Sequence, residues 1–199
     1  MRDFVYFSGR AWTTGNFTDL MKAGRMDIAI HFIINSMFIS HKLRDDVRVH
    51  LVFYGPNDPP KHIIIEPRKK IPETGKDVGS LDISKKDMAG LIKRILFKYK
   101  KDKKIEAFPG CFVEKKNLGK VLDELEKEGK AIYVLDEKGD DVRKVEFKKD
   151  VVMVVGDHIG FPKKELRRLR QTYHTISLGK TVYFASQVAT ILNYELDKK

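Results

Sequence analysis

Short apolar runs alternate with amphipathic stretches along this chain of 199 residues, and this alternation constrains the fold more than any other feature. The run VVMVV at 151–155 is apolar at every position, which is typical of a strand buried on both faces. Strands are predicted in the same way at 4–7, 49–53, 62–66, 111–113, 131–135 and 172–178. Strands that alternate with helices favour a mostly parallel sheet with helices on both faces, which indicates the α/β class.

The spacing of apolar residues and the capping residues predict helices between these strands, at 25–40, 84–100, 118–129, 163–170 and 184–196. Ser84 is a good N-cap, Pro162 suits the first turn of a helix, and Gly129 suits the end of one. The segment DEKGDD at 136–141 is predicted to be a charged turn. Because no linker or internal repeat is found, residues 1–199 are expected to form one domain.

Charge and cysteine content narrow the class of protein. The chain has 39 Lys and Arg against 28 Asp and Glu, a formal net charge of +11 that favours RNA or DNA as the partner. A basic surface that binds nothing is the plain alternative. Cys111 is the single cysteine, which excludes an internal disulfide and a cysteine-based zinc site. No apolar run has the length of a membrane span or a signal-peptide core, so a cytoplasmic protein is expected.

Loops with glycines or polar residues follow three of the predicted strands, and they begin near Leu135, Gly156 and Leu178. Ligands bind parallel sheets at the carboxyl ends of strands, so one ligand site shared by these loops is expected. The alternative is that the glycines only make turns. His158 lies in the second loop, where a structural hydrogen bond is a simpler role for it than proton transfer.

Several common sites are excluded by the motifs that the chain lacks. It has no P-loop, no Rossmann G-x-G-x-x-G, no G-x-S-x-G elbow and no H-E-x-x-H, so no metal is expected. Basic clusters at 67–70, 93–104 and 167–170 suit RNA phosphates, although such clusters are often only a solvated face.

Three polar residues stand in or beside the apolar stretch at 25–40. Asp27 near a helix start is explained by the helix dipole, but Arg25 and Asn35 are harder to explain without a function.

The segments 24–60, 154–162 and 177–197 resemble the archaeal tRNA pseudouridine-54 N1-methyltransferases, the TrmY family of the SPOUT superfamily. The resemblance covers nearly the whole chain in the same order, and GDHIGFP is its most specific motif. It implies a SPOUT-type α/β domain with a C-terminal trefoil knot, a homodimer, and S-adenosyl-L-methionine as the cofactor. The implied activity is methylation of N1 of pseudouridine 54 in the T loop of tRNA.

The resemblance also implies site residues. The predicted cofactor-binding residues are Leu135, Gly156, Leu178, Gly179, Lys180, Thr181, Val182, Tyr183 and Val188. The family often has cysteine near Val188, so a catalytic thiol is untenable here. Asn35 and Asp27 are predicted to orient the pseudouridine base in catalysis. The predicted RNA-binding residues are Arg25, Arg44, Arg48, Arg68 and Lys69.

Two other functions stay open at this point. One is methylation of a different acceptor, such as an rRNA pseudouridine or a ribose 2′-hydroxyl. The other is a non-catalytic RNA-binding or ribosome-assembly factor of the same fold, which need not bind S-adenosyl-L-methionine.

Overall fold

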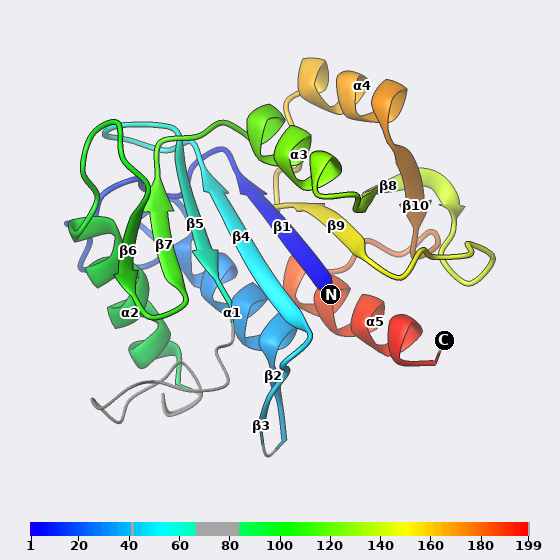
Figure 1. Ribbon diagram of the computed structural model, residues 1–199, viewed down its shortest axis with the longest axis horizontal. Helices are drawn as coiled ribbons and strands as arrows, with labels where there is room; N and C mark the ends of the chain where they lie inside the picture. Colours follow the sequence, from blue (N-terminus) through cyan, green and yellow to red (C-terminus); the bar gives the residue numbers. More distant parts are fainter. Residues whose placement is uncertain (41, 67–83, 199) are drawn as a thin grey trace.

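The computed structural model describes residues 1–40, 42–66 and 84–198. Eight strands of this part of the chain form one sheet in the order β10-β8-β9-β1-β4-β5-β7-β6 (Figure 1). Their bounds are β1 Arg2–Ser8, β4 Val47–Phe53, β5 Lys61–Ile65, β6 Ile105–Phe108, β7 Cys111–Glu114, β8 Ala131–Asp141, β9 Val151–Gly156 and β10 His174–Ser177. The strands from β10 to β4 pair in parallel, and β5, β7 and β6 continue the sheet antiparallel. The predicted α/β fold with a mostly parallel sheet is confirmed.

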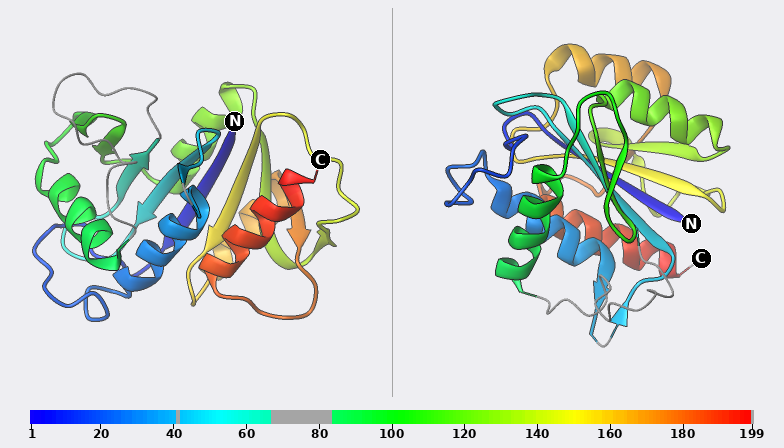
Figure 2. Two further views of the ribbon diagram at one scale, coloured as in Figure 1. Left: turned by 90° about the horizontal axis from the view of Figure 1, so that it is seen from below. Right: turned by 60° about the vertical axis from the view of Figure 1, so that its left-hand side comes forward.

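Helices cover both faces of the sheet, as Figures 1 and 2 show. Their bounds are α1 Met26–Met37, α2 Lys85–Phe97, α3 Leu118–Lys127, α4 Lys163–Thr172 and α5 Ala185–Asp197. Side chains alternate along β1, so Phe4 and Tyr6 pack in the core with α1, α2 and α5, while Val5 and Phe7 pack with α3 and α4. No described helix is long and apolar enough to cross a membrane.

Two local predictions are wrong, and one strand was not predicted. The first helix does not cover 25–40, because Arg25 has a left-handed backbone and residues from 38 onward enter a small hairpin of β2 (Phe38–Ile39) and β3 (Lys42–Leu43). The segment 136–141 is not a turn but the end of β8. The strand that was not predicted is β6.

The end of β8 stays in the sheet through an irregular pairing with β10. Val134 pairs with Thr175 and Asp140 pairs with Ile176, so residues 135–139 bulge out between the two paired stretches. Gly139 lies in this bulge, where a Cβ would come within 2.5 Å of the Ile176 nitrogen. Glu137 and Lys138 are exposed in the bulge, while the buried Asp136 carboxylate accepts from the Arg170 guanidinium at 2.7 and 2.9 Å.

A buried chain of hydrogen bonds crosses four neighbouring strands on the side of the sheet away from α1. His50 Nε2 lies 3.0 Å from Asp3 Oδ1, and His50 Nδ1 lies 2.9 Å from His62 Nε2. His62 Nδ1 in turn lies 3.0 Å from Glu114 Oε1. All four side chains are buried, and Arg48 pairs with Asp3 at one end of the chain.

Candidate functional site

The carboxyl ends of β8, β9 and β10 meet at one edge of the sheet. Val134 of β8 pairs with Val154 of β9 and with Thr175 of β10, so the turns after these strands follow at the same edge. The Ser177 hydroxyl donates to the Glu137 carbonyl at 3.3 Å, which ties the β8 bulge to the end of β10. The sheet thus brings together the loops that the sequence singled out.

A cavity of about 250 Å³ opens at this edge. It is lined by Ile28, Val155, Gly156, Asp157, His158, Val182, Tyr183, Phe184, Ala185, Gln187 and Val188. Four of the predicted cofactor residues line it, namely Gly156, Val182, Tyr183 and Val188. The walls are mostly apolar, and the polar groups come from Asp157, His158 and Gln187.

The other predicted cofactor residues do not line this cavity. Leu135 and Leu178 are partly buried and pack against the core, while Gly179, Lys180 and Thr181 are exposed on the loop that leads to the cavity. Their role in cofactor binding stays a prediction.

The turn after β9 is closed tightly and is held on β1. A Cβ on Gly156 would lie 3.0 Å from Gly160 Cα, so a larger residue would force the turn open. The Asp157 backbone N–H donates to the Phe7 carbonyl at 2.9 Å. The Asp157 carboxylate accepts from the Ser8 hydroxyl at 2.7 Å and from the Ile159 N–H at 2.8 Å. These bonds fix a buried carboxylate at the cavity wall.

Sequence reasoning assigned no role to Asp157, although its position directly after a buried strand was a usable signal. His158 is exposed at the cavity rim, and within the described residues we find no hydrogen bond to its ring. The expected structural hydrogen bond of His158 is therefore not seen.

Arg25 and Asp27 form an ion pair beside the cavity. Arg25 has φ 63°, and its guanidinium donates from Nε and Nη2 to the two oxygens of Asp27 at 3.0 and 2.9 Å. These hydrogen bonds lower the pKa of Asp27, which keeps the carboxylate ionised at neutral pH. The Arg25 side chain is 39% exposed, and Ile28, the residue after Asp27, lines the cavity.

Tyr6 links this ion pair to the turn after β9. Burial raises the pKa of the Tyr6 phenol, and the nearby carboxylates of Asp157 and Asp27 raise it further. Two carboxylates from distant parts of the chain therefore act on the same buried phenol.

Asn35 lies apart from Asp27 on α1, and its predicted role in orienting a base stays a prediction. It is eight residues further along α1, about 12 Å along the helix axis. Its side chain donates to the His31 carbonyl at 2.8 Å and accepts from the Thr190 hydroxyl at 3.1 Å. It lines a separate hollow of about 460 Å³ between α1 and α5. Asn35 is thus not among the residues that line the cavity at Ile28.

Three of the five predicted RNA-binding residues are paired with carboxylates, Arg44 and Arg48 as well as Arg25. Arg44 bonds Asp197 through both terminal nitrogens at 3.0 and 2.5 Å. Arg48 bonds Asp3 at 2.5 Å and Glu128 at 3.1 Å, and both arginine side chains are largely buried. Nothing in this geometry supports a phosphate-binding role for either. Arg68 and Lys69 lie outside the described residues, as does the cluster at 67–70.

Within the described residues, no group of three or more His, Cys, Asp or Glu is arranged to hold a metal ion.

Comparison with known proteins gives matches over the whole chain. The family model described as "Putative SAM-dependent RNA methyltransferase" matches residues 1–199. The tRNA (pseudouridine(54)-N(1))-methyltransferase of Methanococcoides burtonii is 34% identical over 203 residues, covering 100% of this chain and 96% of the relative. The enzyme of the same name from Methanopyrus kandleri is 35% identical over 204 residues, covering 100% and 94%.

A solved structure shares the fold. Archaeoglobus fulgidus Nep1 bound to S-adenosylhomocysteine superimposes with a TM-score of 0.62 at 18% identity, covering 98% of this chain and 96% of that one. The resemblance stated from the sequence is confirmed by these full-length matches.

Proposed function

Because this chain belongs to the family of SAM-dependent RNA methyltransferases, we propose that it methylates N1 of pseudouridine 54 in the T loop of tRNA. Two relatives named for this activity match the chain from end to end at 34% and 35% identity. The observation that carries the proposal is geometric: a largely apolar cavity and a fixed Arg25–Asp27 ion pair meet at one edge of the sheet, next to Ile28.

The cavity residues fit S-adenosyl-L-methionine. Ile28, Val155, Val182 and Val188 supply apolar walls that suit the adenine and the methylthio part of such a ligand. The Asp157 carboxylate and the Gln187 amide suit its hydroxyl and ammonium groups. When bound, the cofactor supplies an electrophilic methyl group on a sulfonium, so in-line placement of the acceptor nitrogen is the main demand on the protein.

We assign the placement of the base to Asp27. An ionised carboxylate accepts hydrogen bonds from the imide of the base, and Arg25 holds that carboxylate in one orientation. Methyl transfer forms the N1–carbon bond, breaks the carbon–sulfur bond and releases the N1 proton. A carboxylate whose pKa is lowered is a poor base, so Asp27 orients the base while water takes the proton.

We further propose a homodimer in the cytoplasm, where its tRNA substrate is found. Three apolar side chains next to the cavity are strongly exposed: Val182 at 89%, Phe184 at 71% and Ile159 at 54%. Exposed apolar groups clustered in this way suit a protein interface, and a second copy would cover them. We also propose that the segment that ends in α5 forms the trefoil knot.

Mass spectrometry of T-loop oligonucleotides tests the function. One oligonucleotide carries uridine at position 54 and a second carries pseudouridine there, and each is incubated with the protein and S-adenosyl-L-methionine. The proposal predicts a single added methyl group on the pseudouridine oligonucleotide alone. Methylation of both oligonucleotides would point to a ribose acceptor, and methylation of neither, with no cofactor bound, would point to a non-catalytic RNA-binding protein.

A further inference from the structure

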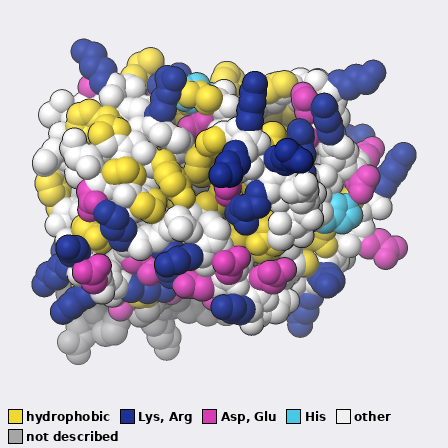
Figure 3. Space-filling model, turned by 90° about the horizontal axis from the view of Figure 1, so that it is seen from above, with side chains coloured by type: hydrophobic (Ala, Val, Ile, Leu, Met, Phe, Trp, Pro, Cys, Tyr) yellow, Lys and Arg dark blue, Asp and Glu magenta, His cyan; other side chains and the backbone are white. Residues whose placement is uncertain are grey.

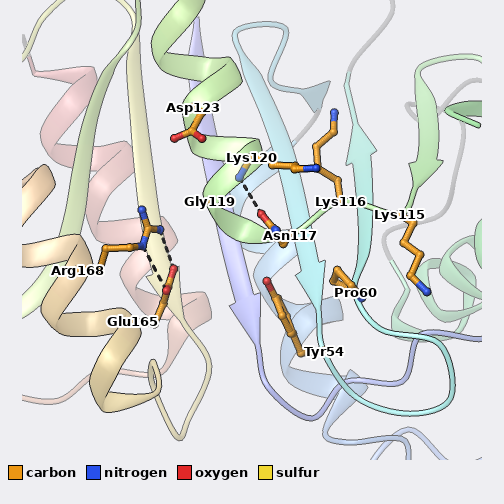
Figure 4. A pocket seen from close by; sticks show the side chains of 10 residues that line it. All are labelled: Tyr54, Pro60, Lys115, Lys116, Asn117, Gly119, Lys120, Asp123, Glu165 and Arg168. Carbon is orange, nitrogen blue, oxygen red and sulfur yellow. Dashed lines mark hydrogen bonds and ion pairs between the residues drawn. The ribbon is translucent and has the colours of Figure 1, made fainter. Parts of the chain in front are cut away.

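Two adjoining hollows form one groove between α3 and α4, on the other side of the sheet from the cavity. Figure 4 shows the side chains that line the first of them. The volumes of the two hollows are about 770 and 690 Å³, and both are lined by Tyr54, Glu165 and Arg168. We call this the α3–α4 groove and define it by Tyr54, Lys120, Lys164, Arg167 and Arg168. Figure 3 looks onto this end of the molecule and shows Lys and Arg side chains gathered on it.

Cations stand on both rims of the groove. Lys115, Lys116 and Lys120 come from the connection before α3 and from its first turn. Lys164, Arg167 and Arg168 come from α4 on the opposite rim.

Only some of these charges are neutralised within the described residues. Lys115 pairs with Asp58, Lys116 with Glu114 and Glu124, and Arg168 with Glu165. For the other three cations, Lys120, Lys164 and Arg167, the described part of the chain offers no carboxylate within ion-pair distance, and all three are exposed. Asp123 is the acid on the rim that holds no described partner, so positive charge remains in excess.

An aromatic floor lies between the rims. The Tyr54 hydroxyl accepts from the Leu118 N–H at 3.1 Å, which anchors the ring at the start of α3. The Tyr54 ring lies 5.3 Å from the Phe7 ring, and Phe7 lies 5.2 Å from Phe161. Cations beside a partly exposed, rigidly held aromatic ring are typical of surfaces that bind unpaired nucleic acid.

One short loop contributes residues to both the cavity and the groove. Gly156, Asp157 and His158 line the cavity, while Pro162 at the other end of the same loop lines the groove. Phe161, between them, packs into the aromatic floor. A chain that leaves the cavity mouth over this loop therefore meets Tyr54 and the cationic rims next.

We propose that the α3–α4 groove binds the sugar–phosphate backbone of an unpaired RNA segment that adjoins the nucleotide in the cavity. The proposal deepens the proposed function and rests on it, since it assumes that the substrate is a folded RNA whose loop is methylated. Lys120 and Arg167 contact phosphates from opposite rims, and Tyr54 offers a face on which a base can stack.

A pair of charge-reversal variants tests this. Lys120→Glu with Arg167→Glu changes both rims of the groove. Lys148→Glu with Lys149→Glu is the matched control, because these exposed lysines precede β9 at the opposite edge of the sheet and carry the same charge change. Binding of a tRNA that carries pseudouridine 54 is titrated at several salt concentrations, and binding of S-adenosyl-L-methionine is measured by calorimetry.

The groove variant is expected to bind the tRNA about 10-fold or more weakly, with a salt dependence shallower by about 1 to 2 in the logarithmic slope. Cofactor affinity should be unchanged, and the control variant should bind tRNA within about twofold of wild type. Equal tRNA binding by both variants would overturn the proposal that the groove binds RNA. If the groove variant loses cofactor affinity, the exposed single substitution Lys164→Glu is expected to reproduce the weaker tRNA binding, and no effect would also overturn the proposal.

The two proposals fail in different ways. A wild-type protein that binds tRNA through the groove but methylates nothing refutes the proposed function and leaves the groove standing. A wild-type protein that methylates tRNA while the groove variant matches the control refutes the groove alone. Absence of tRNA binding by the wild-type protein would refute both.

Discussion

Arg25 and Asp27 form two parallel hydrogen bonds of 3.0 and 2.9 Å across a single intervening residue. Arg25 has a left-handed backbone in this geometry, φ 63°, which residues other than glycine adopt at a cost of about 1–2 kcal/mol. The pair holds the Asp27 carboxylate directly before Ile28, which lines the cavity, and leaves the guanidinium partly exposed. A role of the ion pair in the proposed methyl transfer would account for the free-energy cost of this backbone conformation.

Asp27→Asn removes the charge of the carboxylate and keeps its size. We expect kcat for pseudouridine methylation to fall about 10²-fold, because the base loses its orienting acceptor. The affinity for S-adenosyl-L-methionine should stay within about threefold of wild type, since we propose that the apolar cavity walls and Asp157 bind that ligand. Single-turnover kinetics measure the methylation rate, and calorimetry measures the affinity for the cofactor. A variant that methylates at the wild-type rate would exclude Asp27 from the mechanism.

Arg25→Gly and Arg25→Ala separate the functional role of Arg25 from its backbone. Both lose the guanidinium, so both should lose methylation activity to a similar degree. The glycine variant should be more stable than the alanine variant by about 1 kcal/mol, because glycine adopts φ 63° without strain. Urea unfolding measures the difference in free energy of unfolding. Equal stability of the two variants would argue against the left-handed backbone.

Asn35→Ala is expected to leave the methylation rate within about twofold of wild type. The side chain bonds His31 and Thr190 and lies in a different hollow from the reaction. Loss of these exposed hydrogen bonds should lower the free energy of unfolding by about 1 kcal/mol at most. The single-turnover assay used for Asp27 measures the rate. A large fall in rate with unchanged stability would show that Asn35 takes part in the reaction.

Stability is expected to fall as the pH falls below about 6.5, because of the buried chain from Asp3 to Glu114. Burial lowers the pKa of His50 from 6.5 to about 4. Burial alone would raise the pKa of Glu114, but hydrogen bonds from His62 and Lys116 outweigh it and lower the pKa to about 2. The folded pKa lies below the unfolded one for both groups, so the unfolded chain takes up protons first as the solution is acidified.

The His50 contribution is therefore complete above pH 6.5 and is lost toward pH 4, while the Glu114 contribution is lost from about pH 4.5 toward pH 2. The shift of His50 corresponds to about 3 kcal/mol. Urea unfolding at pH 7.5, 6, 5 and 4 measures it. Stability that stayed constant over that range would contradict the assignment.

Much of the fold was predictable from the sequence because buried strands consist of continuous runs of apolar residues. The runs at 4–7 and 151–155 predicted β1 and β9, and Ser84 caps α2 by accepting from the Asp87 N–H as expected. The bulge in β8 was not predictable, because its charged residues resemble a turn and the close approach of Gly139 to β10 depends on tertiary packing.

Some parts of the candidate site were likewise predictable from the sequence and others were not. The loops were predictable because the carboxyl ends of parallel strands meet at one edge. Residues whose partners lie far along the chain were not: Arg44 bonds Asp197, and Arg48 bonds Asp3, so neither carries the free charge that its sequence neighbourhood suggests. The residue type of Arg25 does not indicate its left-handed backbone. The position of Asn35 away from the cavity could not be predicted from the sequence either.

A crystal structure of the protein with S-adenosylhomocysteine tests the central claim most directly. The account predicts ligand density in the cavity between the turn at Gly156 and the segment from Val182 to Val188, with the sulfur directed toward the side of Arg25 and Asp27. Density for the ligand at another place, with this cavity closed or filled by side chains, would contradict it.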